Sequence, residues 1–355
     1  MQVTSQLAAA TAATRAGASV VDDALREGRL LRSSAADLLD RRERLLLEGA
    51  IDESSRVPVA GGMNGDLSRV LVQDPVHSWN RRWVIEKDAG AQAAQEEFGW
   101  RVARELGIDH LVPAAMRRAD GIARIEFREG RSLSLSGITD SAALEDALAG
   151  SYLRDATLGL DEAGARRAAL VDRQLLQCFD YLLANNDRHT ANGLYDATSG
   201  VLSFIDSGHA GRGQLASNGG SVLVPALRKL QAGSKGGHVD LDPAVVDYLR
   251  RRTSADRLRA IHAATFDRAG VAGPAPRTYG ERFLPHARST TYRDGIVARY
   301  EHVLDRGGYD HAPYQGDAAG DLPPLDGPDP NARGLRQVRA AFAGVGGGRG
   351  GFDRF

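Results

Sequence analysis

The chain is poor in sulfur-containing and aromatic residues, with one cysteine, three methionines, three tryptophans and 6% aromatic residues among 355. The single cysteine, Cys178, has no partner for an internal disulfide, which fits a reducing compartment such as the cytoplasm and leaves secretion open. No apolar run of about 18 residues occurs and the first residues lack the apolar core of a secretory signal, so we expect no membrane insertion. The formal net charge of −1 provides no overall field that would attract nucleic acid.

Hydrophobic periodicity changes along the chain and predicts its organisation. Residues 4–48 have leucines near helical spacing, which predicts an N-terminal helical arm. Short β-type runs follow between Val57 and Lys87, then a helix over residues 91–106 that ends at Gly107, and two more β-type runs over 111–118 and 121–127. These changes divide the chain into an arm at 1–55 and a β-rich lobe at 56–130 that carries one helix.

The remainder of the chain is predicted to form a mostly helical lobe at 131–320 and an extended or disordered tail at 321–355. The strongest helix covers about residues 165–183 and has one apolar stripe, which includes Cys178. Two short strands follow at 193–196 and 201–206, and helices resume beyond Asp240. The predicted fold class is therefore α+β with two lobes, and a cleft between two lobes is a common ligand site.

Polar residues gather where the strongest helix ends, in the run Asn186-Asp187-Arg188-His189-Thr190-Ala191-Asn192. Phosphoryl transfer needs a carboxylate near the attacking hydroxyl and oxygen ligands for Mg²⁺. Asp187 can act as the base, and Asn192, five residues later, as a metal ligand. The following hairpin would bring Asp206 back beside Asn192 as a second metal ligand. Either half of the motif alone is typical of an ordinary loop or turn, and only their joint spacing favours a catalytic role.

The segment FDYLLANNDRHTANGLYD and the later FIDSG resemble the catalytic and metal-binding loops of the phosphatidylinositol 3/4-kinase-like branch of the protein-kinase superfamily, which has D-R-H-x-x-N followed by D-x-G. Similar loops occur in toxin kinases of the HipA type. The order H-R-D-x-x-x-x-N of ordinary eukaryotic protein kinases is not present. The resemblance implies a bilobal protein-kinase-like fold, with ATP and Mg²⁺ or Mn²⁺ as cofactors.

The resemblance also implies roles for individual residues. Asp187 matches the catalytic aspartate, and Asn192 and Asp206 match the two metal-binding residues. His189 either stabilises the transferring phosphate or braces the loop, and both roles stay open. Arg188 is expected to pair with a nearby carboxylate.

A kinase-like fold also requires a lysine for the phosphates and an acidic residue that orients it. Lys87 ends a predicted strand and is the only lysine before Lys229. Its partner is expected on the following helix, at Glu96 or Glu97, with Glu96 slightly favoured. Glu86 precedes Lys87 on the strand and should point to the opposite face of the sheet.

Two other segments are candidates for contacts with the nucleotide. The first is a glycine-rich turn between two predicted strands, which could cover phosphates with its backbone amides or could be an ordinary hairpin turn. The second occupies the position of the hinge between the lobes, where backbone groups would face the adenine. The residues concerned are Gly61, Gly62 and Gly65 in the turn, and Glu126, Phe127 and Arg128 in the hinge.

The sequence thus predicts an ATP-dependent phosphotransferase that moves the γ-phosphate to a hydroxyl acceptor. A protein or peptide Ser/Thr is the favoured acceptor, because the chain lacks the basic runs expected of a lipid kinase. A small-molecule or lipid kinase, a pseudokinase that only binds, and an unrelated α+β protein are the alternatives. The geometric test is whether Lys87, Glu96, Asp187, Asn192 and Asp206 meet at one cleft.

Overall fold

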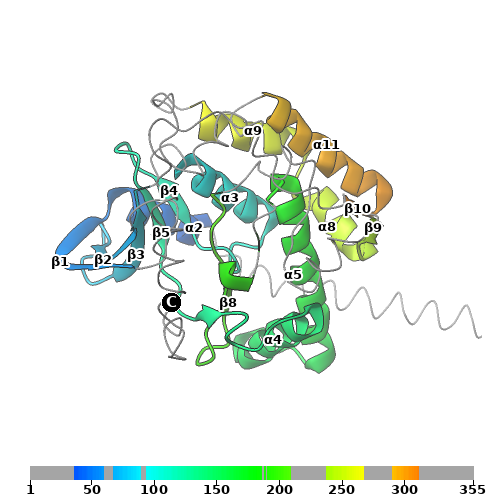
Figure 1. The fold of residues 1–355 in the computed structure, drawn as a ribbon, viewed down its shortest axis with the longest axis horizontal. Helices are drawn as coiled ribbons and strands as arrows, with labels where there is room; N and C mark the ends of the chain where they lie inside the picture. Colours follow the sequence, from blue (N-terminus) through cyan, green and yellow to red (C-terminus); the bar gives the residue numbers. More distant parts are fainter. Residues whose placement is uncertain are drawn as a thin grey trace, which may run out of the picture.

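The computed structural model describes residues 36–59, 67–88, 93–185, 188, 190–208, 237–267 and 290–311. The part of the chain between Ala50 and Glu126 contains an antiparallel sheet of five strands in the order β1-β2-β3-β5-β4 (Figure 1). Its strands are β1 (Ala50–Pro58), β2 (Leu67–Gln73), β3 (Arg81–Lys87), β4 (Ala115–Arg117) and β5 (Ala123–Glu126). Two helices accompany the sheet, α2 (Ala36–Glu48) and α3 (Ala93–Leu106).

Helix α3 lies between the sheet and the helical part of the molecule, and most of its side chains are buried (Figure 1). It packs against β4 on one side and against α5 (Glu162–Leu183) and α9 (Ala255–Phe266) on the other. Gly107 follows its last residue with a φ of 73°, a conformation that favours glycine and ends the helix as predicted. A helix in this position connects the two halves of the core.

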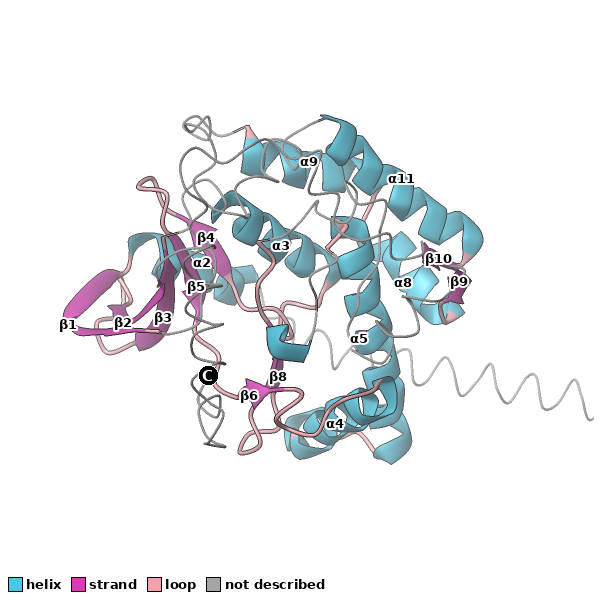
Figure 2. Ribbon diagram, in the orientation of Figure 1, coloured by secondary structure: helices cyan, strands magenta, loops and turns pink. Residues whose placement is uncertain are grey.

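The later part of the chain is mostly helical, as Figure 2 shows. Each of three helices begins at a side chain that accepts a hydrogen bond from the first turn, namely Asp140, Asp161 and Ser254. The other elements are α4 (Ser141–Arg154), α8 (Pro243–Arg252), α11 (Thr290–Arg306), a sheet of β6 (Arg131–Ser132), β7 (Gly193–Tyr195) and β8 (Leu202–Phe204), and the pair β9 (Gly237–Asp240) and β10 (Gly308–His311).

Helix α2 covers one face of the five-stranded sheet. Its Leu45 and Leu46 pack with Val70, Val72 and Val84 in an apolar cluster separate from the large core of the helical part. Burying such side chains stabilises the fold by roughly 1.5–3 kcal/mol each. The helix therefore belongs to the folded sheet unit.

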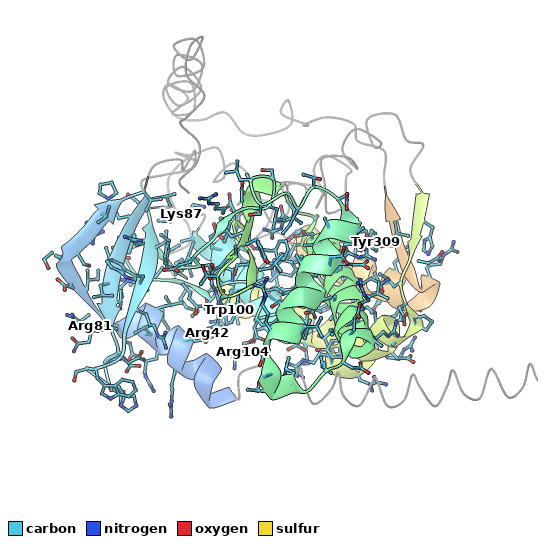
Figure 3. All side chains as sticks on the ribbon, turned by 90° about the horizontal axis from the view of Figure 1, so that it is seen from below. Arg42, Arg81, Lys87, Trp100, Arg104 and Tyr309 are labelled. Carbon is cyan, nitrogen blue, oxygen red and sulfur yellow. The ribbon has the colours of Figure 1, made fainter. Side chains whose placement is uncertain are left out.

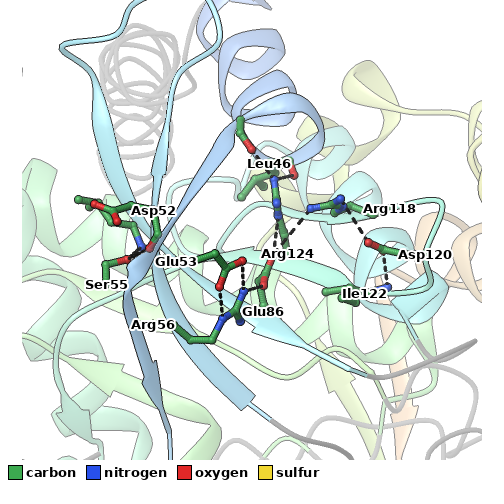
Figure 4. Close-up of polar contacts among 12 residues, drawn as sticks. Leu46, Asp52, Glu53, Ser55, Arg56, Glu86, Arg118, Asp120, Ile122 and Arg124 are labelled. Carbon is green, nitrogen blue, oxygen red and sulfur yellow. Dashed lines mark hydrogen bonds and ion pairs between the residues drawn. The ribbon is translucent and has the colours of Figure 1, made fainter.

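Polar contacts hold α2 in place both at its C-terminal end and at Glu43. The Arg124 guanidinium donates to the carbonyl of Gly49 at 2.9 Å and to that of Leu46 at 3.3 Å, and it pairs with Glu86 at 2.8 Å (Figure 4). A cation is favourable beside the exposed carbonyls at the C-terminal end of a helix. Nearer the start of α2, one Glu43 oxygen accepts hydrogen bonds from the indole N–H of Trp100, at 3.1 Å, and from Arg104, at 2.8 Å. These contacts attach α2 to β5 and to α3.

The α+β class and the order of a sheet-rich part followed by a helical part are confirmed, and the arrangement is consistent with a bilobal kinase-like fold. The first strand begins at Ala50, earlier than the predicted Val57, because β1 is a largely exposed edge strand without an alternating apolar pattern. The segment after Phe127 contains the two-residue strand β6. Residues 1–35 of the predicted arm, residues 312–320 of the predicted helical lobe and the predicted tail at 321–355 lie outside the described residues, and the domain boundaries stay predictions.

Among the helices that the structure describes, none is both long enough and apolar enough to cross a membrane.

The single cysteine is expected to be inert in the folded protein. Cys178 is fully buried in the core, as predicted, and burial raises the pKa of its thiol to about 12. Because the thiolate is the reactive form, iodoacetamide should leave Cys178 unmodified at about pH 8 and label it fully in denaturant. Mass spectrometry of the two samples would measure this, and rapid labelling of the native protein would contradict it.

Candidate active site

Three side chains from separate elements meet at the end of β3. The ammonium of Lys87 lies 2.7 Å from Glu96 Oε1, on α3, and 3.4 Å from Asp206 Oδ1, just beyond β8. Lys87 and Glu96 are both buried, whereas the side chain of Asp206 is 30% exposed. Glu96 thus holds the buried ammonium of Lys87 beside the carboxylate of Asp206, which solvent can reach.

Glu96 also fixes the backbone beyond Asp206. Its second oxygen, Oε2, accepts a hydrogen bond of 3.0 Å from the N–H of Ser207. Helix α3 approaches this segment closely at Gly99, where an added Cβ would lie 2.4 Å from the Cβ of Ser207. Only a glycine at this position allows the helix and the segment to come so near, and this contact sets the distance between Glu96 and Asp206.

The choice between the two neighbouring glutamates is decided by their different partners. Glu97 is buried but pairs with Arg101 at 2.8 Å and accepts the Arg117 N–H at 3.3 Å, so it does not contact Lys87. Glu86 lies on the other face of the sheet, as expected. It pairs there with Arg124 at 2.8 Å and with Arg56 at 2.9 Å.

The backbone around Asp206 is held in an unusual conformation. Asp206 has a φ of 61°, in the left-handed region that aspartate and asparagine tolerate better than most residues. The hairpin of β7 and β8 brings Asn192 beside Ile205, the residue before Asp206, and the Asn192 carbonyl accepts the Ile205 N–H at 2.9 Å. The residues just before Asp206 are anchored further by the bond of 2.7 Å from the Phe204 N–H to the Leu111 carbonyl. The candidate metal ligands Asn192 and Asp206 therefore sit on adjacent, well-anchored backbone.

A buried ion pair also helps to hold the segment just before Asp206 in place. Arg188 lies 3.2 Å from Asp180, and neither side chain is exposed to solvent. Arg188 also donates to the carbonyl of Ile205, the residue before Asp206. The expectation that Arg188 pairs with a nearby carboxylate is confirmed. Asp180 was not anticipated, since an acidic residue near the end of an amphipathic helix has no distinctive sequence pattern.

The charge of Lys87 is stabilised by its surroundings. Burial alone would lower the pKa of Lys87, because a charged group loses its hydration. The nearby carboxylates of Asp206 and Glu96 outweigh burial and raise the pKa above its ordinary value. Lys87 is thus a permanent cation at neutral pH, which suits a contact with an anionic ligand.

Other predicted site residues are only partly described. Asp187, His189, Gly61, Gly62 and Gly65 lie outside the described residues, so their positions stay predictions. In the predicted hinge, the Glu126 N–H donates to Ala114 at 2.8 Å and the Phe127 N–H donates to Trp83 at 3.2 Å. These two donors are used within the sheet, and an adenine would have to contact other backbone groups of Glu126, Phe127 or Arg128.

One further residue near Lys87 was missed by sequence analysis. Arg69 on β2 pairs with Ile85 across the strands, which places it on the face of the sheet that Lys87 shares. Its guanidinium lies 4.5 Å from the centre of the Trp83 ring and 5.2 Å from that of Phe127. The alternation of side chains along β2 could have placed Arg69 on this face, but a single arginine belongs to no recognisable motif.

No protein-family model matches the chain, and no curated protein matches it by sequence. Among solved structures, the chain is similar to the Helicobacter pylori proinflammatory kinase CtkA, with a TM-score of 0.42 and 13% sequence identity. The alignment covers 74% of this chain and 97% of that one. A TM-score this low does not establish a shared activity.

Proposed function

We propose that the chain is an ATP- and Mg²⁺-dependent phosphotransferase that moves the γ-phosphate of ATP to a hydroxyl acceptor. The observation that carries this proposal is the meeting of Lys87, Glu96 and Asp206, of which Lys87 and Asp206 are 119 residues apart in sequence. A lysine paired with a helix glutamate, beside a metal-binding aspartate, is the arrangement that phosphoryl transfer uses. The two proposed lobes run over 56–130 and 131–320.

Each residue then has a defined task. Lys87 binds oxygens of the phosphate chain, and Glu96 keeps its ammonium in place. Asp187 orients the acceptor hydroxyl and accepts its proton. The hydroxyl oxygen bonds to the γ-phosphorus as the bond to the bridging oxygen breaks, and ADP leaves. Most of the rate enhancement comes from positioning and electrostatic stabilisation.

The donor set near Asp206 fits a hard divalent cation. Mg²⁺ prefers oxygen ligands, usually one or two carboxylates together with phosphate oxygens and water. Asp206 offers a partly exposed carboxylate, and Asn192 offers an amide oxygen on adjacent backbone. Bound there with ATP, the ion would neutralise charge on the phosphates.

A serine or threonine hydroxyl of a protein or peptide is the acceptor that we propose. A lipid kinase needs a basic surface that attracts an anionic membrane, and the chain has a formal net charge of −1. A small-molecule acceptor remains the second possibility, and an assay that offers both classes separates them.

Asp206→Asn should abolish transfer while leaving the fold intact. Asparagine also tolerates the left-handed backbone of Asp206, but it removes the charge, so we expect turnover of γ-³²P-ATP with Mg²⁺ to fall by about 10²–10³-fold. The assay follows radioactive phosphate into water, the protein itself and candidate acceptors, with mass spectrometry to locate it.

Asp256→Asn is the matched control, because Asp256 is exposed on α9. It should turn over like the wild type, and both variants should melt within a few degrees of it. Binding of ATP without any transfer by the wild type would indicate a pseudokinase. A wild type that does not bind ATP would refute the proposal entirely.

A further inference from the structure

A cavity lies on the face of the five-stranded sheet opposite to Lys87. It has a volume of about 400 Å³ and is bounded by α2, by the start of β3 and by the loop of residues 74–80. Its lining includes Arg41, Arg82, Trp79, Leu45 and Val84. Ligand cavities in proteins commonly have volumes of roughly 300–1,000 Å³, so this one is large enough for a small organic molecule.

Strand alternation separates this cavity from the Lys87 site. Side chains two apart on a strand share a face, so Arg82 and Val84 point away from the face of Lys87. Val84 pairs across the strands with Glu126, which also lines the cavity. Figure 3 likewise shows Arg42, which lies on α2, well away from Lys87. The cavity therefore lies on the opposite face of the sheet from Lys87, and it meets the predicted nucleotide site at Glu126, a residue of the hinge.

The carboxylates that line the cavity already have partners. Asp74 accepts the N–H of Val76 at 2.8 Å and of His77 at 3.0 Å, and the side-chain amide of Asn80 at 3.1 Å. Glu126 pairs with Arg42 and, at 3.0 Å, with Arg128. Glu126 is thus paired with arginines, whereas the donors to Asp74 are neutral amides and leave it a buried anion in the lining.

Two arginines in the lining are not neutralised in this way. Within the described ranges, no carboxylate pairs with Arg41 or with Arg82. Among the described residues, the Arg82 guanidinium donates to the side-chain oxygen of Asn80, at 3.2 Å. Both guanidiniums are exposed and reachable by a ligand. With the carboxylate of Asp74 counted against Arg41 and Arg82, the lining keeps an excess of one positive charge beside an apolar wall of Leu45 and Val84.

An exposed aromatic residue, Trp79, lines part of the cavity. The Trp79 side chain is 81% exposed, which is unusual for the largest apolar residue. The three hydrogen bonds to Asp74 fix the loop that carries it, and the Trp79 ring lies 5.5 Å from that of His77. An exposed tryptophan on a fixed loop offers a flat surface at little cost in conformational entropy.

We infer that this cavity binds a small planar aromatic anion. The ring of the ligand packs on Trp79 and against Leu45 and Val84, and its carboxylate or sulfonate group contacts Arg41 and Arg82. Guanidiniums bind such groups through paired, charge-assisted hydrogen bonds. This site does not depend on the proposed phosphotransferase activity.

Binding of 8-anilino-1-naphthalenesulfonate, a fluorescent planar anion, tests the inference on the full-length chain. We expect saturable binding with one site per chain. The double variant Arg41→Gln/Arg82→Gln should weaken it at least 10-fold, and Trp79→Ala should weaken it several-fold. The neutral analogue N-phenyl-1-naphthylamine should bind more weakly and respond little to the arginine changes.

The double variant Arg166→Gln/Arg259→Gln is the control, because it removes two exposed arginines elsewhere and should leave the dye affinity unchanged. Equal affinity in the Arg41/Arg82 variant, tighter binding of the neutral analogue, or displacement of the dye by ATP would each overturn the inference.

Discussion

Replacing Lys87 by methionine is expected to remove phosphate transfer and to destabilise the protein. Transfer should fall by about 10²–10³-fold, because Lys87 is the cation that contacts the phosphates in the proposed site. The free energy of unfolding should fall by roughly 3–5 kcal/mol, because the change leaves Glu96 as a buried charge without its partner. Single-turnover assays and urea denaturation measure the two effects separately.

The double variant Lys87→Met/Glu96→Gln distinguishes the two contributions. Neutralising Glu96 removes the unpaired charge, so most of the lost stability should return while transfer stays absent. A double variant that recovers transfer would show that Lys87 has only a structural role. A single variant with unchanged stability would mean that the Lys87–Glu96 ion pair makes no net contribution to the free energy of unfolding, and it would contradict this prediction.

Replacing Gly99 by alanine is expected to disturb the candidate active site, because α3 packs there against the segment that carries Asp206. Alanine normally stabilises a helix relative to glycine by roughly 0.5–1 kcal/mol. Here its Cβ would lie 2.4 Å from the Cβ of Ser207, so the segment that carries Asp206 must move. We expect Gly99→Ala to lower the unfolding free energy by about 1–3 kcal/mol and transfer by on the order of 10²-fold.

A compensating change at Ser207 provides the control. Ser207→Gly removes the Cβ that the new methyl group meets, but it keeps the N–H that Glu96 accepts. The double variant Gly99→Ala/Ser207→Gly should therefore recover much of the transfer and stability. If Gly99→Ala alone behaves like the wild type, the close packing of α3 against this segment does not set the site geometry.

Sequence analysis located the parts of the site that follow from local pattern. Lys87 stood out as the last residue of a strand, and Asp206 as the residue after an apolar strand and a hairpin. Helix and strand order could place both near the same cleft. Sequence could not decide between Glu96 and Glu97, because the choice depends on how α3 is rotated about its axis. Packing against β4 directs Glu97 to Arg117, which leaves Glu96 facing Lys87.

Other features depend on contacts between distant segments and left no local signal. Gly99 looks like a weak point in a helix until Ser207 is placed beside it. Asp180 looks like an ordinary polar residue until Arg188 folds back onto it. Strand β1 was underestimated because an exposed edge strand does not alternate between apolar and polar residues. The cavity beneath α2 exists only once that helix is docked on the sheet.

The docking of α2 has a practical consequence for any shortened version of the protein. A chain that began at residue 56 would lack Leu45 and Leu46, and it would expose the apolar side chains of Val70, Val72 and Val84 to water. It would also lack most of β1, leaving the hydrogen-bonding groups of β2 unpaired. An apolar patch beside an open strand edge promotes self-association, so such a fragment should aggregate, whereas one that begins before Ala36 keeps its sheet covered.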